Sequence, residues 1–274
     1  MRRTGFVLTA AAVLALAACG GGGGTKILSP EQSKQAVADA AQKTLAANLH
    51  VDISVTLRAA SGQGAAVYAA TGDLTPSLGR IDVDQRNVGG DLHHEVVARQ
   101  GGHLVLYESP ANIDLPKGKT WLKLDLTRYG EKRYGANTVF LAGADQDPFA
   151  ALQLVTAAVT NVTDLGLQWL PDDTLNTHYR ARVDVVAVAR EKGVKGAKLT
   201  ALSSDVGDRT QTIDVWVSKQ GRIARVKVLK TLRDASTGAK LSQSSIADFN
   251  HFGERVNVSL PPARLVADYF SLVG

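Results

Sequence analysis

The chain has 274 residues, of which 45% are apolar and 21% charged, with a formal net charge of +5 and a single cysteine. This length suits one large domain or two small ones, and a single cysteine excludes an intramolecular disulfide. The positive charge is mild and includes no dense run of Lys and Arg interleaved with aromatic residues, so no nucleic acid is expected as a partner.

The N-terminus has the features of an export signal. Arg2 and Arg3 precede an apolar stretch at residues 6–16, which has the length of a signal-peptide core and is too short to span a bilayer. The motif LAAC at residues 16–19 follows and resembles the bacterial lipobox, whose cysteine is diacylated on sulfur and becomes the first residue of the mature chain. We therefore expect residues 1–18 to be a lipoprotein signal peptide.

Cys19 is accordingly the predicted lipid anchor. Two acyl chains, such as palmitate, hold a protein on a bilayer stably, whereas one chain does so only marginally. Residues 20–24 are all glycine, and glycine-rich segments behave as flexible chain. The sequence thus predicts a diacylglyceryl-cysteine and tether at residues 19–28, which attach the protein to the outer face of the cell membrane.

A helix is expected to open the mature domain. Ser29 is a candidate N-cap, Pro30 suits the first helical position, and Gln32 completes a capping-box pattern. Apolar residues then recur at helical spacing, which predicts an amphipathic helix over residues 30–47.

From residue 50 the apolar period changes from 3.6 to two, as in strands with one covered face. In HVDISVTLR (50–58), the side chains of Val51, Ile53, Val55 and Leu57 share one face. Turns, several of them containing glycine, separate this segment from similar ones. The strands expected in this half lie at residues 50–58, 65–74, 80–85, 92–98, 103–108 and 120–126.

A helical pattern then interrupts the strands. Asp147 is a candidate N-cap and Pro148 the first helical residue, and Phe149, Leu152 and Val155 follow at spacings of three. The elements expected after it are strands at 178–189, 211–218, 222–233 and 241–250, with short helices within 190–209 and within 261–270.

These elements predict an α+β fold in one domain at residues 29–274. The expected architecture is a single large curved antiparallel β-sheet of about ten strands, a half-barrel whose concave face is covered by helices. Two or three helices cannot cover so broad a concavity, and small aliphatic side chains leave apolar space that accepts apolar guests. The alternation leaves open which strand face is concave. The residues expected to line this cavity are Val55, Leu57, Leu104, Leu106, Leu122, Leu124, Phe149, Leu152, Val155, Ile213 and Val215.

Motifs for catalysis, nucleotide binding or metal binding are missing from the sequence. His93 and His94 are adjacent, so on a strand they face opposite sides and cannot chelate one ion together. We therefore expect no enzyme, no cofactor and no metal. Basic residues cluster at 117–133 and 216–230, either as ordinary exposed strands and loops or at a cavity mouth that meets anionic lipid headgroups.

Four segments carry a family resemblance: GKTWLKLDL, NTHYRARVDV, IDVWVSKQGRIARVKV and DFNHFGERVNVSLPPA. In this order, and with the lipobox, they resemble the LppX/LprG-type lipoproteins of mycobacteria and related actinobacteria, from about Ser29 to Tyr269. The resemblance implies a LolA/LolB-like half-barrel that binds multi-acylated lipids or lipoglycans in an apolar cavity and helps move them toward the outer envelope. It implies no catalytic residues.

The sequence therefore favours a membrane-anchored lipoprotein that binds acylated lipid or glycolipid and carries it across the cell envelope, with an envelope transporter as a possible further partner. The alternative is an envelope sensor or scaffold lipoprotein of the same fold, whose core is closed and which binds a protein partner.

Overall fold

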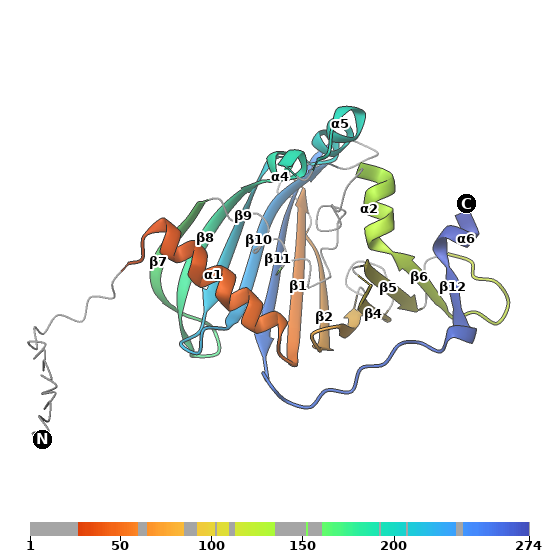
Figure 1. Cartoon of the computed structure of the whole chain (residues 1–274), viewed down its shortest axis with the longest axis horizontal. Coiled ribbons are helices and arrows are strands. Elements are labelled where there is room, and N and C mark those ends of the chain that lie inside the picture. Colours follow the sequence, from red (N-terminus) through yellow and green to blue (C-terminus); the bar gives the residue numbers. More distant parts are fainter. Residues whose placement is uncertain are drawn as a thin grey trace, which may run out of the picture.

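A computed structural model describes residues 27–59, 65–84, 92–101, 103–109, 113–134, 152, 161–191, 193–206, 208–233 and 238–273. Within them, twelve strands form one sheet in the order β12-β6-β5-β4-β3-β2-β1-β11-β10-β9-β8-β7, which is unclosed and has β12 and β7 at its edges (Figure 1). Neighbouring strands are antiparallel except for β12, which runs parallel to β6. The expected α+β fold with one large antiparallel sheet is confirmed.

The strands are β1 (Leu49–Ala59), β2 (Ala65–Leu74), β3 (Leu78–Asp84), β4 (Leu92–Gln100), β5 (His103–Ser109), β6 (Trp121–Asp125), β7 (Asn161–Trp169), β8 (Leu175–Asp184), β9 (Thr210–Val217), β10 (Ile223–Arg233), β11 (Lys240–Asn250) and β12 (Val266–Asp268). The described α-helices are α1 (Pro30–Leu45), α2 (Leu126–Tyr134), α4 (Val185–Glu191), α5 (Gly196–Asp205) and α6 (Tyr269–Val273).

Helix α1 begins where the sequence predicts. Ser29 is the N-cap, its hydroxyl accepts from the Gln32 N–H at 3.4 Å, and the Gln32 side chain accepts from the Ser29 N–H at 3.1 Å. This is the capping box expected from the spacing of the two residues. The helix then lies diagonally across the strands from β7 toward the start of β1 (Figure 1).

Both ends of α1 are fastened to the sheet by hydrogen bonds. At its start, the Leu28 N–H donates to the Asp164 carboxylate on β7 at 2.9 Å. At its end, the fully buried Thr44 hydroxyl donates to the Ala40 carbonyl at 2.8 Å and accepts from the Ile223 N–H at 2.9 Å. These bonds determine the line along which the helix crosses the sheet.

We call the sheet face that α1 covers the inner face. Val51 and Ile53 of β1 lie opposite Phe249 and Ala247 of β11, and all four side chains are buried in the cluster that includes α1. Because paired residues point to the same side of a sheet, the register extends this face from strand to strand. The predicted alternation of β1 is confirmed, with Val51 on the covered face and Asp52 exposed.

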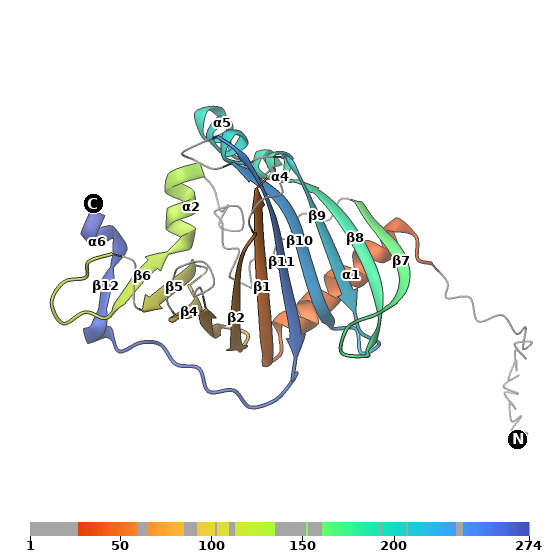
Figure 2. The same ribbon diagram turned by 180° about the vertical axis from the view of Figure 1, so that it is seen from behind.

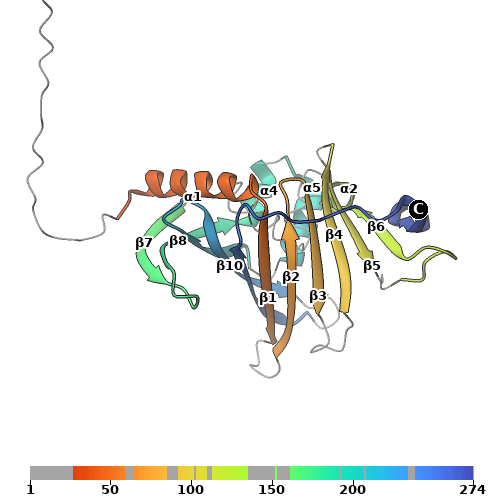
Figure 3. The ribbon, with the colours of Figure 1, turned by 90° about the horizontal axis from the view of Figure 1, so that it is seen from below.

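The sheet is strongly bent. Seen from below, strands β1 to β6 are turned relative to strands β7 to β10, and α1 lies along the second group (Figure 3). Helices α4 and α5 lie at the opposite end of the strands from the turn that joins β7 to β8 (Figure 1). A single helix therefore covers only part of the inner face.

The C-terminal segment joins the middle of the sheet to one of its edges. After β11 the chain runs across to the far edge, where β12 pairs with β6 (Figure 2). There Val266 and Trp121 pack against a second buried cluster that includes Val96, Val105 and Tyr107. This covers part of the outer face, the side opposite α1.

The structure differs from the sequence prediction at several elements. Strand β7 and the short β12 were not expected, and they raise the count from about ten strands to twelve. The strand expected at 178–189 ends at Asp184 and continues as α4, because the Asp184 carboxylate accepts from the N–H groups of Val186 and Ala187 and so caps a helix. The region expected as a short helix at 261–270 contains a 3-10 turn, β12 and the start of α6 instead.

Replacing Thr44 tests how firmly α1 is held. Thr44→Val keeps the shape of the side chain but leaves the buried Ile223 N–H without its acceptor, so the free energy of unfolding should fall by about 1 to 3 kcal/mol. Thr200→Val, on the exposed face of α5, is the matched control. Urea denaturation of both variants measures the difference, and equal stabilities would contradict the assigned role.

Candidate functional site

The inner face joins most of the residues that the sequence assigned to a cavity wall. Val55, Leu104, Leu152, Ile213 and Val215 are buried in one cluster, each no more than 5% exposed, and Leu106 packs against it. Residues from four separate parts of the chain thus meet in one buried cluster.

Of the remaining predicted wall residues, the strand register puts three on the inner face, and the others lie outside the described residues. Leu57 follows Val55 on the same face of β1, and Leu124 and Leu122 lie opposite Leu106 and Glu108. Phe149, Val155 and Cys19, with the helix expected from Asp147, lie outside the described residues.

A pocket of about 890 Å³ lies at the end of the strands where the turns of β7–β8 and β9–β10 meet the end of β11. Its apolar lining is contributed by Leu167, Trp169, Leu175, Ala224, Phe249 and Phe252. A volume of this size accommodates a small-molecule ligand or part of a lipid. The predicted wall residues belong to the packed core beside it, and the described lining of this pocket is made of other residues.

Local irregularities in two strands shape the pocket. In β7 the register shifts between Asp164 and Leu167, and Gly166 adopts φ 83° at this bulge. In β10 the register shifts between Ile223 and Arg225, and Ala224, which lies between them, lines the pocket. Bulges bend a strand and redirect its side chains, so both strands curve around the pocket instead of continuing flat.

The rim of the pocket carries charges of both signs. Lys219 and Arg222 come from the β9–β10 turn, while Asp172 and Asp173 come from the β7–β8 turn. The Arg222 guanidinium lies 5.1 Å from the centre of the Phe252 ring, a cation–π distance. Two members of the predicted basic cluster therefore do border a pocket, alongside two carboxylates.

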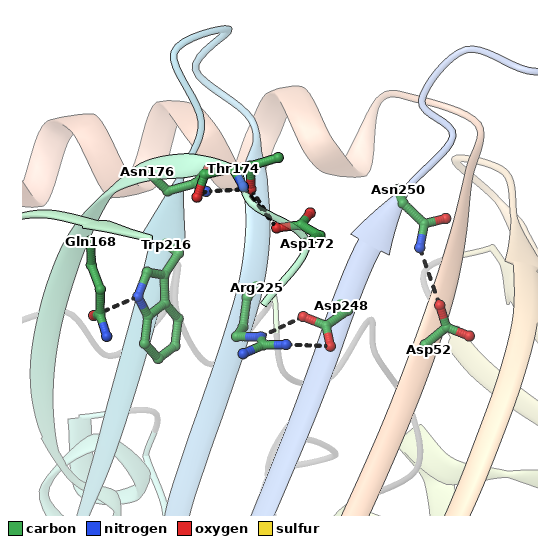
Figure 4. Close-up of polar contacts among 9 residues, drawn as sticks. All are labelled: Asp52, Gln168, Asp172, Thr174, Asn176, Trp216, Arg225, Asp248 and Asn250. Carbon is green, nitrogen blue, oxygen red and sulfur yellow. Dashed lines mark hydrogen bonds and ion pairs between the residues drawn. The ribbon is translucent and has the colours of Figure 1, made fainter. Parts of the chain in front are cut away.

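Polar contacts on the outer face hold the pocket-forming turns in place (Figure 4). The Trp216 indole N–H donates to the Gln168 side chain at 2.9 Å, which links β9 to β7 across β8. Within the β7–β8 turn, the Thr174 hydroxyl donates to Asp172 at 2.7 Å and accepts from the buried Asn176 amide at 2.8 Å. Such satisfied buried groups rigidify the turn.

Asp214 is the centre of this outer network. Its carboxylate, 3% exposed as a residue, accepts from the Arg180 Nε at 2.7 Å and contacts His178 Nε2 at 2.9 Å, and the His178 ring stacks on Trp216. Burial by itself would raise the pKa of the Asp214 carboxyl, but the hydrogen bonds from Arg180 and His178 outweigh it and hold the pKa below its ordinary value. The group is a structural support for the sheet.

Buried polar groups on the inner face escaped the sequence analysis. His93 Nε2 lies 3.0 Å from Glu95 Oε1, and Glu95 is paired directly opposite Glu108 on the same inner face. Burial, followed by the neighbouring Glu95 charge, raises the pKa of the Glu108 carboxyl. The signal in the sequence was the interruption of apolar alternation at positions 93 and 95, where Val or Leu would continue the pattern.

Lys230 is a second inner-face polar group. It lies opposite Gln243 of β11, which is 2% exposed and donates to the Ser245 hydroxyl at 3.0 Å. Burial lowers the pKa of the Lys230 ammonium to about 8. The inner face therefore carries buried or half-buried polar groups beside its apolar cluster.

The histidines lie beside carboxylates. His93 and His94 lie on opposite faces, as the sequence predicts, since His94 pairs with Asp82 of β3 and not with Glu95. Every histidine in the described residues lies within ion-pair distance of a carboxylate. Groups of three or more metal-ligating side chains are absent from the part of the chain that the structure describes.

Among the described residues, the helices are all too short or too polar to cross a bilayer.

With the site described, the chain can be compared with known proteins. The fold is that of an open, helix-covered antiparallel sheet, and its solved neighbours include LppX, a lipoprotein of Mycobacterium tuberculosis, at 14% identity and a TM-score of 0.47 over 84% of this chain and 100% of LppX. A LolA-superfamily protein from Nitrosomonas europaea matches at 12% identity and a TM-score of 0.31, over 85% of this chain and 96% of that protein. The MucA/MucB complex of Pseudomonas aeruginosa matches at 9% identity and a TM-score of 0.34, over 85% of this chain and 59% of that one.

The neighbours thus include LppX and LolA-type proteins, which the sequence resemblance named. Family models and curated proteins give no match to this sequence. At identities below 15% the likeness concerns the fold alone, so we take no ligand or activity from these proteins.

Removing the inner-face ammonium should alter the pH dependence of stability. Because the pKa of Lys230 is lowered to about 8 in the folded state, the unfolded chain binds more protons between pH 8 and 10, so the free energy of unfolding should rise over this range. For a partly exposed side chain we expect a rise of about 1 kcal/mol.

Lys230→Met should abolish this rise, whereas Lys227→Met, on the outer face of the same strand, should preserve it. Urea titrations at pH 7, 8, 9 and 10 provide the measurement. An unchanged pH profile in Lys230→Met would show that burial of this group is not responsible.

Proposed function

We propose that this protein is a lipid-anchored envelope lipoprotein that binds an acylated lipid or glycolipid and carries it across the cell envelope. The supporting observation is the 890 Å³ pocket, whose floor is formed by large apolar side chains and whose rim is charged. The apolar floor suits acyl chains, and the charged rim suits a polar headgroup.

The continuity of the pocket with the inner face also supports this proposal. Phe249 lines the pocket and belongs to the buried cluster that contains Val55, Ile213 and Val215. An acyl chain that entered beside Phe249 would meet mostly apolar side chains as it advanced between α1 and the sheet, with the buried hydroxyls of Ser33 and Thr44 on the helix side. In this proposal the first carbons of the acyl chain lie in the pocket. The rest of the acyl chain lies among the predicted wall residues, which separate to admit it.

An envelope sensor or scaffold is the alternative. It would use the same fold to bind a protein partner, and the buried cluster would stay closed. Several wall residues, among them Val55 and Ile213 at 0% exposed, are packed into the buried cluster. The two functions therefore differ in whether this buried cluster opens to admit lipid.

Filling the pocket should reduce lipid binding. Ala224→Trp places a large ring in the pocket at a half-buried position and should raise the Kd for a fluorescent diacyl phospholipid about tenfold, a loss of about 1.4 kcal/mol. Ala263→Trp, exposed on the 3-10 turn, is the control. Native mass spectrometry of the purified chain reports any lipid that stays bound.

Failure of the full chain to retain or take up diacyl or triacyl lipid, with both variants equal to it, would favour the sensor or scaffold.

The anchor is tested separately at Cys19. Labelling of growing cells with an alkyne-tagged palmitate should modify the wild-type chain, and Cys19→Ser should remove the label and release the protein from carbonate-washed membranes. Two acyl chains confer stable attachment, so the loss should be nearly complete. Retention of Cys19→Ser on washed membranes would contradict anchoring at this residue.

A further inference from the structure

One edge of the sheet exposes large apolar side chains where the N-terminal segment meets the domain. We call this the apolar edge: Ile27 is 67% exposed, and on β7 Leu165, Leu167 and Trp169 are 46%, 48% and 65% exposed. The Leu28 N–H donates to the Asp164 carboxylate at 2.9 Å, which brings the N-terminal segment that carries Ile27 to β7, the strand that carries Leu165. A contiguous group of large exposed apolar residues on a soluble surface marks an interaction site.

The apolar edge adjoins the mouth of the pocket. Leu167 and Trp169 line the pocket, whereas Ile27 and Leu165 belong to the edge but not to the described lining. Leu175, itself 39% exposed, lies opposite Trp169 and extends the apolar surface on to β8. Leu167, Trp169 and Leu175 therefore belong both to the pocket lining and to this exposed apolar surface.

The edge is presented rigidly. Gln168 points to the outer face, where it accepts from Trp216, so its neighbours Leu167 and Trp169 point to the inner side. The Asp172–Thr174–Asn176 contacts brace the turn that follows Trp169 (Figure 4). The exposed side chains are thus held by a strand that pairs with β8 and by the hydrogen-bonded turn that follows it.

Chain length limits the distance between this edge and the proposed anchor. Eight residue steps separate Cys19 from Ile27, and an extended chain spans at most about 3.6 Å per residue, or about 29 Å in total. Trp169 lies five residues beyond Asp164, about 17 Å along the strand. The N-terminal end of the apolar edge therefore stays within about 29 Å of the proposed anchor, close enough for the edge to reach the bilayer surface.

Charge does not select the partner here. The pocket rim offers Lys219 and Arg222 but also Asp172 and Asp173, so the local balance is near neutral. A strongly charged protein or polymer finds no complementary field, whereas exposed Leu, Ile and Trp suit the interfacial region of a bilayer, where Trp is enriched.

We propose that the apolar edge docks on the bilayer surface and holds the mouth of the pocket against the lipid. This deepens the proposed function and rests on its anchor at Cys19. Lipid then passes between bilayer and pocket with its acyl chains shielded from water by Leu167, Trp169 and Leu175. Because apolar contact drives the docking, it does not need anionic lipid and is insensitive to salt.

The test uses the full chain, purified with its lipid anchor and reconstituted in phosphatidylcholine vesicles whose acyl chains are brominated. Bromine quenches nearby tryptophan, and subtraction of Trp169→Phe isolates the Trp169 emission from that of Trp121 and Trp216. We expect brominated lipid to quench this emission by about half and aqueous iodide to lose access to it.

Two paired variants make the result specific. Ile27→Gln/Leu165→Gln alters the edge outside the described pocket lining and should abolish the quenching by lipid. Ile113→Gln/Leu260→Gln removes two comparably exposed apolar residues elsewhere (39% and 42%) and should leave it unchanged. Added salt should have no effect.

Each other outcome overturns the proposal in a recognisable way. Equal quenching in both paired variants would show that another surface meets the bilayer. Absence of quenching with the anchor intact would overturn docking but not anchoring. A chain without palmitate label would remove the anchor on which docking rests. Protection of Trp169 from iodide in detergent, with a dimer in sedimentation, would assign the edge to a second copy of the chain.

Discussion

The path of α1 across the inner face is the constraint on which the site depends. Twelve strands in an open sheet present a face far wider than one helix, so whatever α1 leaves uncovered must be packed by other segments or remain hollow. Asp164 holds the start of the helix and Thr44 bonds its end to β10. Because both fastenings use buried or half-buried backbone groups, the helix has little freedom to slide, and the pocket lies beyond its cover at the turn end of the strands.

Beside its apolar cluster, the inner face carries two pairs of polar side chains, Glu95 with Glu108 and Lys230 with Gln243, and the two pairs are arranged differently. Glu95 and Glu108 lie opposite each other beside His93, so neutralisation of one carboxyl relieves repulsion. Lys230 lies beside Gln243 at the other side of the bend. A carrier of amphipathic molecules needs such pairs only if headgroups travel inside. In a carrier whose lipid headgroups stay at the pocket rim, these buried polar groups serve folding alone. The charged rim of the pocket favours this second case, in which the headgroup stays outside.

The proposed function and the proposed attachment meet at one edge of the molecule. The sheet ends at β7, the N-terminal segment joins the domain beside β7, and the pocket opens toward the same strand. An exposed Trp169 at that position has a cost in water, because large apolar surface is left unburied in the free protein. Its placement between the proposed anchor and the pocket gives that exposed surface a physical use, since a bilayer removes it from water.

Local patterns in the sequence determined the elements whose interactions are short in range. Ser29, Pro30 and Gln32 form a cap within one turn of helix, and the alternation of β1 depends only on neighbouring residues, so both were predicted correctly. Strand β7 was missed because its bulge breaks the alternation between Asp164 and Leu167. Which face is covered, which residues line the pocket and which carboxylate each histidine meets were decided only by the tertiary structure. Those contacts join residues far apart in the chain, and spacing along a sequence carries no information about register between distant strands.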